Sequence, residues 1–242
     1  MWETEKPRKA WGQDDDHVDL IHVAGVIDAP EAELLIDCGM TRLGFPLVLD
    51  HHSEDLSVAA AADIVARYAD RATFFLITYL GRADDILSLC QQLDVKMVQL
   101  HGPVTNDELQ RLRTIAPDLT IIKSLVVGRD NAIALQSDVA LSADCVDGFI
   151  TDTFDPISGA SGATGRVHDW AISRQIVVLS PKPVILAGGL NPENVASAID
   201  AVRPAGVDVH TGLEGPDGRK RADLTARFVA AARTAFAKLS DC

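Results

Sequence analysis

Residues 183–214 read PVILAGGLNPENVASAIDAVRPAGVDVHTGLE, and this stretch holds two strand–glycine–helix units in tandem. In the first unit a short apolar run predicts a buried strand, and the chain then turns at Gly188 and Gly189. A helix is expected to begin at Pro192, because proline suits the first helical position and Asn191 suits the N-cap.

The second unit repeats this arrangement. The run 206–210 predicts another strand, which ends at the glycine turn made by Thr211 and Gly212. Backbone N–H groups at strand ends and helix starts favour an anion. In a (β/α)8 barrel the loops after strands seven and eight commonly hold a phosphate. The two glycine turns together therefore predict a phosphate site. The alternative is that these glycines only form tight turns.

The rest of the chain alternates strands and helices in the same way. Most strand candidates are continuous apolar runs, as expected for parallel strands buried on both faces. Eight complete units favour a closed (β/α)8 TIM barrel, an α/β fold of one domain, over an open doubly wound sheet. The predicted strands are 18–24, 42–49, 72–78, 96–100, 119–124, 147–152, 183–187 and 206–210, and the predicted helices are 30–38, 57–69, 83–92, 106–115, 131–141, 170–179, 192–202 and 221–239.

Composition limits the possible partners. The 242 residues carry a formal net charge of −13, and lysine and arginine form no cluster, which argues against nucleic acid and anionic membranes. Residues 1–17 are polar and predict a flexible extension, and 18–242 predict the barrel. No signal peptide or membrane span is recognisable, so we expect a cytoplasmic protein, either a monomer or a homodimer. The four cysteines have neither metal nor redox spacing, and we expect no cofactor and no metal.

The active site of such a barrel lies where its strands end, and the predicted strand ends are polar. This contrast with the apolar strand interiors favours catalysis, although a fold alone never proves activity. The expected mouth residues are Ala24, Gly25, Asp50, His51, His52, Thr78, Tyr79, Gln99, His101, Lys123, Ser124, Asp152, Thr153, Gly188, Gly189, His210, Thr211 and Gly212.

Several of these segments resemble the phosphoribosylanthranilate isomerase family of tryptophan synthesis. The resemblance runs from about residue 20 to residue 228 and is closer in the C-terminal half. It is carried by VQLHG (98–102), IIK (121–123), TDT (151–153), GATGRVHDW (162–170), LAGGLNPENV (186–195), VDVHTGLE (207–214) and GRK (218–220).

The resemblance implies an Amadori rearrangement, in which an aminoaldose phosphate becomes an aminoketose phosphate without metal or nucleotide. It implies that Asp152 is the general acid, where the alternative is an aspartate that only caps a loop. Asp208 would be a buried support, and a structural role remains the alternative for His101. The expected substrate-binding residues are Gln99, His101, Lys123, Glu54 and Arg166, and the implied phosphate ligands are Gly162, Thr164, Gly165, Gly188, Gly189, Thr211 and Gly212.

Two positions depart from the family pattern at the reacting half of the ligand. Ala24 stands where the family has the cysteine that serves as general base, and a methyl group cannot accept a proton. Glu54 and Asp55 stand about where an arginine meets the anthranilate carboxylate, so attraction becomes repulsion. These departures predict an aldose–ketose isomerase for a phosphorylated sugar or aminosugar other than phosphoribosylanthranilate.

The identity of the base stays open among three histidines. His22 shares a strand face with Ala24 and lies roughly 7 Å below it, whereas His51 and His52 are expected nearer the surface. A metal bound by Asp50, His51, His52, Glu54 and His101 is a further alternative, although no metal-ligand spacing supports it. The alternative functions are a phosphosugar-binding protein without activity and a metal-assisted epimerase or lyase.

Overall fold

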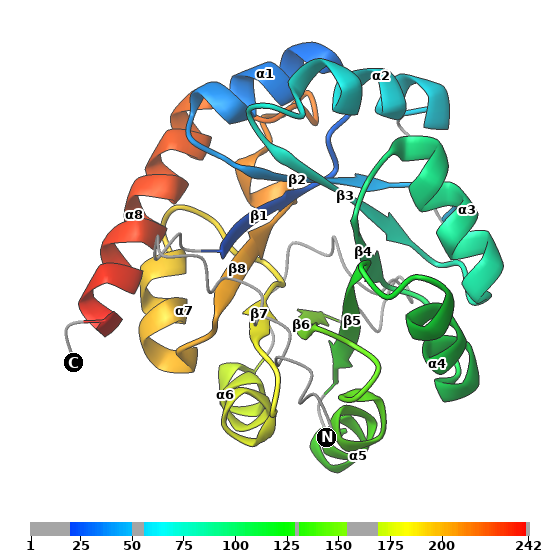
Figure 1. The fold of residues 1–242 in the computed structure, drawn as a ribbon. Helices are drawn as coiled ribbons and strands as arrows, with labels where there is room; N and C mark the ends of the chain where they lie inside the picture. The colour runs from blue at the N-terminus through cyan, green and yellow to red at the C-terminus, as the bar shows by residue number, and fades with distance from the viewer. Residues whose placement is uncertain (1–19, 50–55, 129–130, 154–168, 241–242) are drawn as a thin grey trace, which may run out of the picture.

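Eight parallel strands form a closed barrel in the computed structural model, which describes residues 20–49, 56–128, 131–153 and 169–240 (Figure 1). Each strand pairs with its neighbour in sequence, and β1 closes the ring by pairing with β8. The strands are β1 (Leu20–Ala24), β2 (Arg42–Pro46), β3 (Thr73–Thr78), β4 (Met97–Leu100), β5 (Thr120–Val127), β6 (Gly148–Thr153), β7 (Val184–Leu186) and β8 (Gly206–Val209).

The helices form the outer ring around this barrel (Figure 1). Several begin where the sequence supplies a cap: the side chains of Asp28, Ser57, Thr105 and Asp169 each accept a hydrogen bond from a backbone N–H of the first turn. The helices are α1 (Ala29–Asp37), α2 (Val58–Tyr68), α3 (Ala83–Leu93), α4 (Asn106–Ile115), α5 (Ala132–Ser142), α6 (Trp170–Leu179), α7 (Val195–Val202) and α8 (Ala222–Ser240), with a 3-10 turn, η1 (Thr211–Leu213), before α8.

Two separate hydrophobic clusters follow from the alternation of side chains along each strand. The larger cluster packs the outer strand faces against the helices and includes Val23, Leu76 and Leu100. The smaller cluster fills the barrel interior and consists of Ala24, Phe75, Ile77, Met97, Ile122, Ile150, Ile185 and Ala187. The barrel interior is therefore a packed core rather than a channel.

The closed barrel is confirmed, and the open sheet is excluded. Most predicted bounds shift by one or two residues, but helix α7 begins at Val195 rather than at Pro192. The reason is that the side chain of Asn191 accepts hydrogen bonds from Glu193 N and Asn194 N, which forms a turn ahead of the helix. The predicted extension 1–17 lies outside the described residues.

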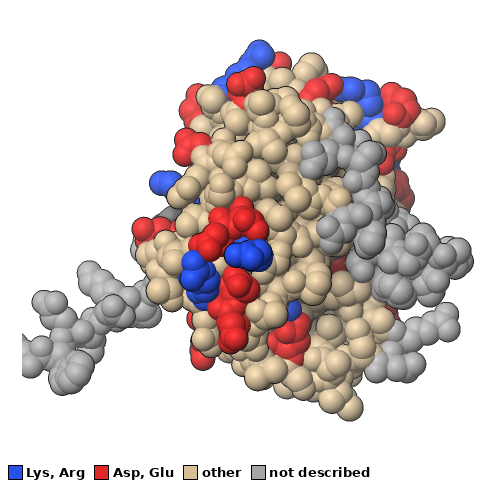
Figure 2. All heavy atoms as spheres, turned by 90° about the vertical axis from the view of Figure 1, so that its right-hand side faces the viewer, with Lys and Arg blue, Asp and Glu red and all other residues tan. Residues whose placement is uncertain are grey.

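Charged side chains of both signs are intermixed on the face that carries α3 and α4 (Figure 2). One example is the pair Arg111–Asp84, which joins these two helices at 2.8 Å. No helix in the described part of the chain is long and apolar enough to cross a membrane.

Candidate active site

A ring of polar side chains lies at the carboxyl ends of the strands. Gln99 on β4 donates a hydrogen bond of 3.3 Å to the hydroxyl of Ser124 on β5. The same hydroxyl lies 3.1 Å from Nδ1 of His101, and that nitrogen lies 3.9 Å from Oδ2 of Asp152 on β6. The structure therefore brings together three of the predicted site residues, Gln99, His101 and Asp152, with Ser124, which was expected at the mouth without a role.

Asp152 has the environment of a proton donor. Its burial raises the pKa of the carboxyl above the usual value of 3.8, and the nearby His101 opposes this shift only in part. Its Oδ1 also accepts a hydrogen bond of 2.7 Å from the backbone N–H of Thr153, which fixes the rotamer. A carboxyl group with a raised pKa holds a proton closer to neutral pH, as general acid catalysis needs.

A second buried carboxyl group lies near the first. Burial raises the pKa of Asp208 well above the ordinary value of an aspartate, the charge of Asp152 raises it further, and the charge of Lys220 lowers it. Its Oδ1 is buried without a hydrogen-bond partner among the residues that the structure describes. The charges of the two carboxyl groups repel each other, so ionisation of Asp152 disfavours ionisation of Asp208.

The two glycine loops predicted to bind phosphate meet at adjacent strands. Strand β7 pairs with β8, and a methyl group placed on Gly212 would come within 1.9 Å of the carbonyl oxygen of Leu190. Gly188 and Gly189 both have positive φ angles, 96° and 64°, which glycine adopts without strain. The close contact requires glycine at position 212 and places the loops after β7 and β8 side by side.

His22 lies too deep to serve as predicted. Its ring is fully buried inside the barrel, with its centroid 5.0 Å from that of Phe75. Burial, together with the charge of Arg42, lowers the pKa of His22 to about 3. A group this weakly basic and this far below the mouth is a packed interior residue, so its assignment as the base is withdrawn.

Lys123 also lies away from the mouth. Its Nζ is 2.5 Å from Oδ2 of Asp138 on helix α5, so the side chain points outward from the barrel. The neighbouring residue, Ser124, occupies the inward position instead, because successive side chains of a strand alternate faces. The prediction that Lys123 binds substrate is therefore corrected.

Several predicted site residues lie outside the described residues. These are His51, His52, Glu54, Gly162, Thr164, Gly165 and Arg166, and with them Asp50 and Asp55. Within the described ranges, no group of three or more His, Cys, Asp or Glu side chains could hold a metal ion.

One cluster at the mouth was not recognised in the sequence. Nε2 of His210, just after β8, lies 3.4 Å from Oε1 of Glu214, and Nζ of Lys220 lies 3.3 Å from that same oxygen. Lys220 also donates a hydrogen bond of 2.8 Å to the carbonyl oxygen of Gly25. The available signal was the VDVHTGLE segment, in which His210 was placed at the mouth without a role.

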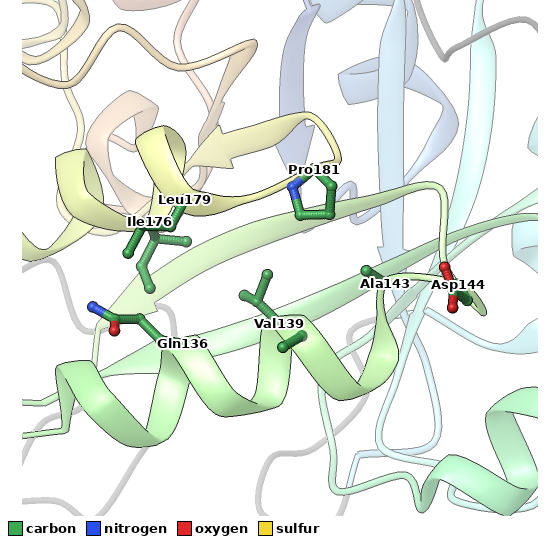
Figure 3. A pocket seen from close by; sticks show the side chains of 8 residues that line it. Gln136, Val139, Ala143, Asp144, Ile176, Leu179 and Pro181 are labelled. Atoms are coloured by element: carbon green, nitrogen blue, oxygen red, sulfur yellow. The ribbon is translucent and has the colours of Figure 1, made fainter.

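A cavity of about 320 Å³ lies outside the barrel, between α5 and α6 (Figure 3). Its lining is mostly apolar and includes none of the polar residues at the mouth, so we assign it no part in catalysis. The lining residues are Gln136, Val139, Ala140, Ala143, Asp144, Ile176, Leu179 and Pro181.

The chain is similar to proteins of known family. The family model described as N-(5'phosphoribosyl)anthranilate (PRA) isomerase matches residues 47–231. N-(5'-phosphoribosyl)anthranilate isomerase 2 of Methanosarcina mazei is 37% identical over 221 residues, which cover 90% of this chain and 96% of that protein. N-(5'-phosphoribosyl)anthranilate isomerase of Methanothrix thermoacetophila is 31% identical, over 88% of this chain and 98% of its own length. The crystal structure of phosphoribosyl anthranilate isomerase from Thermotoga maritima has a TM-score of 0.75 at 24% identity and covers 90% of this chain and all of that one.

These similarities contradict the prediction of a substrate other than phosphoribosylanthranilate, together with its alternatives of a silent binding protein and a metal-assisted enzyme. Relatives that share 31–37% identity over about nine-tenths of this chain carry the name of the family enzyme. The prediction was wrong because it inferred a different substrate from Ala24 and Glu54 alone. A base or a cation from another loop can act on the same substrate.

Proposed function

Because this chain belongs to the phosphoribosylanthranilate isomerase family, we propose that it converts N-(5'-phosphoribosyl)anthranilate to the corresponding aminoketose phosphate in tryptophan biosynthesis. The observation that carries this proposal is the buried carboxyl group of Asp152, with its raised pKa, at the same barrel mouth as the glycine loops after β7 and β8. The ligand we assign to the site is the phosphorylated substrate, and we retain the expectation of a monomer or a homodimer.

In this reaction the furanose ring opens before the proton shift. Asp152 gives its proton to the ring oxygen as the C1–O bond breaks, and the substrate nitrogen supplies the electrons that form a C1=N bond. The desolvated carboxyl group of Asp152 favours its protonated form, which is the reactant in this step. His101 lies beside Asp152 and stabilises the carboxylate that remains.

The phosphoryl group occupies the turns at Gly188, Gly189, Thr211 and Gly212 in this proposal. Support comes from the contact between Gly212 and Leu190, which joins the two turns at one edge of the mouth. Loops at this position commonly bind phosphate in barrels of this type. Gly162, Thr164, Gly165 and Arg166 stay assigned to the same group as predictions, since they lie outside the described residues.

We further infer that the chain is a member of the family without the cysteine base on β1. Ala24 ends that strand and lies in the interior cluster with Phe75 and Ile77. Its methyl group leaves the reaction without a proton acceptor at this position, so the acceptor comes from a neighbouring element. The role of the acidic pair Glu54–Asp55, which lies outside the described residues, remains a prediction.

The test is a direct assay of the purified protein with phosphoribosylanthranilate, together with rescue of a tryptophan auxotroph that lacks the isomerase. We expect turnover and rescue, and a kcat lower by about 10²- to 10⁴-fold in Asp152→Asn with little change in KM. Asp138→Asn is the matched control, because this carboxylate lies outside the barrel against Lys123, and its kcat is expected to be unchanged. Neither turnover nor rescue by the wild type would refute the proposed function.

A further inference from the structure

The imidazole of His210 lies directly over the end of β1. A methyl group placed on Gly25 would meet Nε2 of His210 at 2.1 Å, Cδ2 at 2.7 Å and Cε1 at 2.9 Å. Only a residue without a side chain leaves this space for the ring, and Gly25 also has a φ angle of 76°. Gly25 directly follows Ala24, so the ring of His210 lies next to the position where the proton acceptor is lacking.

A closed set of contacts holds the ring there. Oε1 of Glu214 lies 3.4 Å from Nε2 of His210 and 3.3 Å from Nζ of Lys220, and Nζ of Lys220 bonds to the carbonyl oxygen of Gly25. The path thus runs from Gly25 through His210, Glu214 and Lys220 back to Gly25. The carboxylate of Glu214 is placed to stabilise an imidazolium, and Lys220 anchors that carboxylate.

The position of His210 also suits access to a ligand. It follows Asp208 by two residues at the end of β8, and its side chain is 28% exposed, whereas Asp208 is buried. Strands β6 and β8 are two positions apart, which is roughly 10 Å along the barrel wall. A sugar bound between Asp152 and His210 would therefore have one proton-transferring group on each of two sides.

The other described histidines do not fit this role. Nδ1 of His101 is within reach of Asp152 and Ser124, so this ring belongs to the acid side of the site. His22 is fully buried below Ala24. We propose that His210, supported by Glu214, is the general base that removes the C2 proton of the substrate, an assignment that rests on the proposed function.

The proposed step balances without any further reactant. After ring opening, the C2–H bond breaks and its proton forms a new N–H bond on the imidazole of His210. The C–H electron pair becomes the C1=C2 bond, and the C1=N electron pair moves to the iminium nitrogen, which becomes neutral. The resulting enolamine then tautomerises to the ketone. The C1=C2 electron pair forms a C1–H bond with the proton of the His210 imidazolium, the C2 O–H bond breaks as its electron pair forms C2=O, and the released proton returns to the carboxylate of Asp152.

The experiment compares His210→Ala and His210→Asn with the wild type, using phosphoribosylanthranilate and its C2-deuterated form. We expect both variants to lose about 10²- to 10⁴-fold in kcat with little change in KM, and to show a larger deuterium isotope effect than the wild type. Added imidazole should restore part of the kcat of His210→Ala, because that variant leaves a gap over Gly25, and should not restore His210→Asn. Asp217→Asn, in the same loop but exposed, is the control that should keep the wild-type rate.

Other outcomes overturn the assignment. A kcat that both variants retain, or a rise in KM alone, would make His210 a phosphate contact or a structural residue. A fall in kcat without imidazole rescue and without a larger isotope effect would also exclude it as the base. If the wild type itself does not turn over the substrate, the proposed function fails and the base assignment fails with it.

Discussion

The ammonium group of Lys220 donates a hydrogen bond of 2.8 Å to the carbonyl oxygen of Gly25, across 195 positions of sequence. The backbone N–H of Lys220 also bonds to Oε1 of Glu31 on α1 at 2.9 Å, and its side chain is 1% exposed. The segment before α8 is therefore fastened to the loop after β1. Gly25, at one end of this connection, is also the residue against which the ring of His210 packs.

Replacing Lys220 by methionine should destabilise the protein. The change leaves Glu214, Glu31 and the Gly25 carbonyl oxygen without their buried cation, and breaking a buried ion pair costs about 3–5 kcal/mol. Urea denaturation followed by circular dichroism measures the loss. Lys238→Met on the exposed face of α8 is the control and should stay within about 0.5 kcal/mol of the wild type. Equal stabilities for the two variants would contradict this account of Lys220.

Alanine substitutions at two glycines with nearly the same φ angle distinguish displacement of the His210 ring from backbone strain. Gly25 has a φ of 76° and Gly218 a φ of 74°, but an added methyl group meets His210 only at Gly25 and nothing within 4 Å at Gly218. Each substitution to alanine should cost about 1–2 kcal/mol of stability from the left-handed conformation. Only Gly25→Ala should also lose activity, because it pushes the imidazole away. Steady-state kinetics and thermal melts of both variants check this, and equal activities would argue against a role for the ring.

The sequence predicted the barrel because its parallel strands are buried on both faces and read as uninterrupted apolar runs. The same apolar runs do not indicate which side chains point into the barrel and which point towards the helices. Lys123 and Ser124 were both placed at the mouth, whereas alternation puts only Ser124 there. In an uninterrupted apolar run, the residues on the two faces of the strand have the same character. The sequence therefore cannot tell which of two successive side chains points into the barrel.

The site was predicted only as far as local motifs reach. Asp152, Gln99 and His101 lie in short segments that end single strands, so each could be placed without knowledge of the others. The contact between His210 and Gly25 joins the last strand to the first. Such a contact depends on closure of the barrel, and no local pattern in the sequence encodes it.

Asp208→Asn should make the protein more stable, and increasingly so as the pH rises. The pKa of Asp208 is higher in the folded protein than in the unfolded chain. Its contribution to the free energy of unfolding is therefore most favourable below the unfolded pKa, near 3.8, and is lost as the pH rises through the folded pKa. Between the unfolded and the folded pKa, the free energy of unfolding falls by at most about 1.4 kcal/mol per pH unit because of this group. Denaturation of wild type and variant at pH 5 and pH 8 measures the difference. A stability gap that stays constant between the two pH values would show that burial of this carboxyl group carries no such cost.

His22 should have the opposite effect on acid stability. The pKa of His22 is lowered from 6.5 to about 3 in the folded protein. Between these two pH values the unfolded chain binds a proton at His22 and the folded protein does not. Stability from this residue is complete above pH 6.5 and is lost as the pH falls towards 3, by at most about 1.4 kcal/mol per unit. His22→Gln, which does not titrate, should flatten this decline in urea denaturation at pH 7.5, 6 and 5. The buried carboxyl groups are common to both proteins, so their opposing contribution cancels in the comparison. Parallel pH curves for wild type and variant would mean that His22 takes up a proton in the folded barrel, and the case against it as the base would then fall.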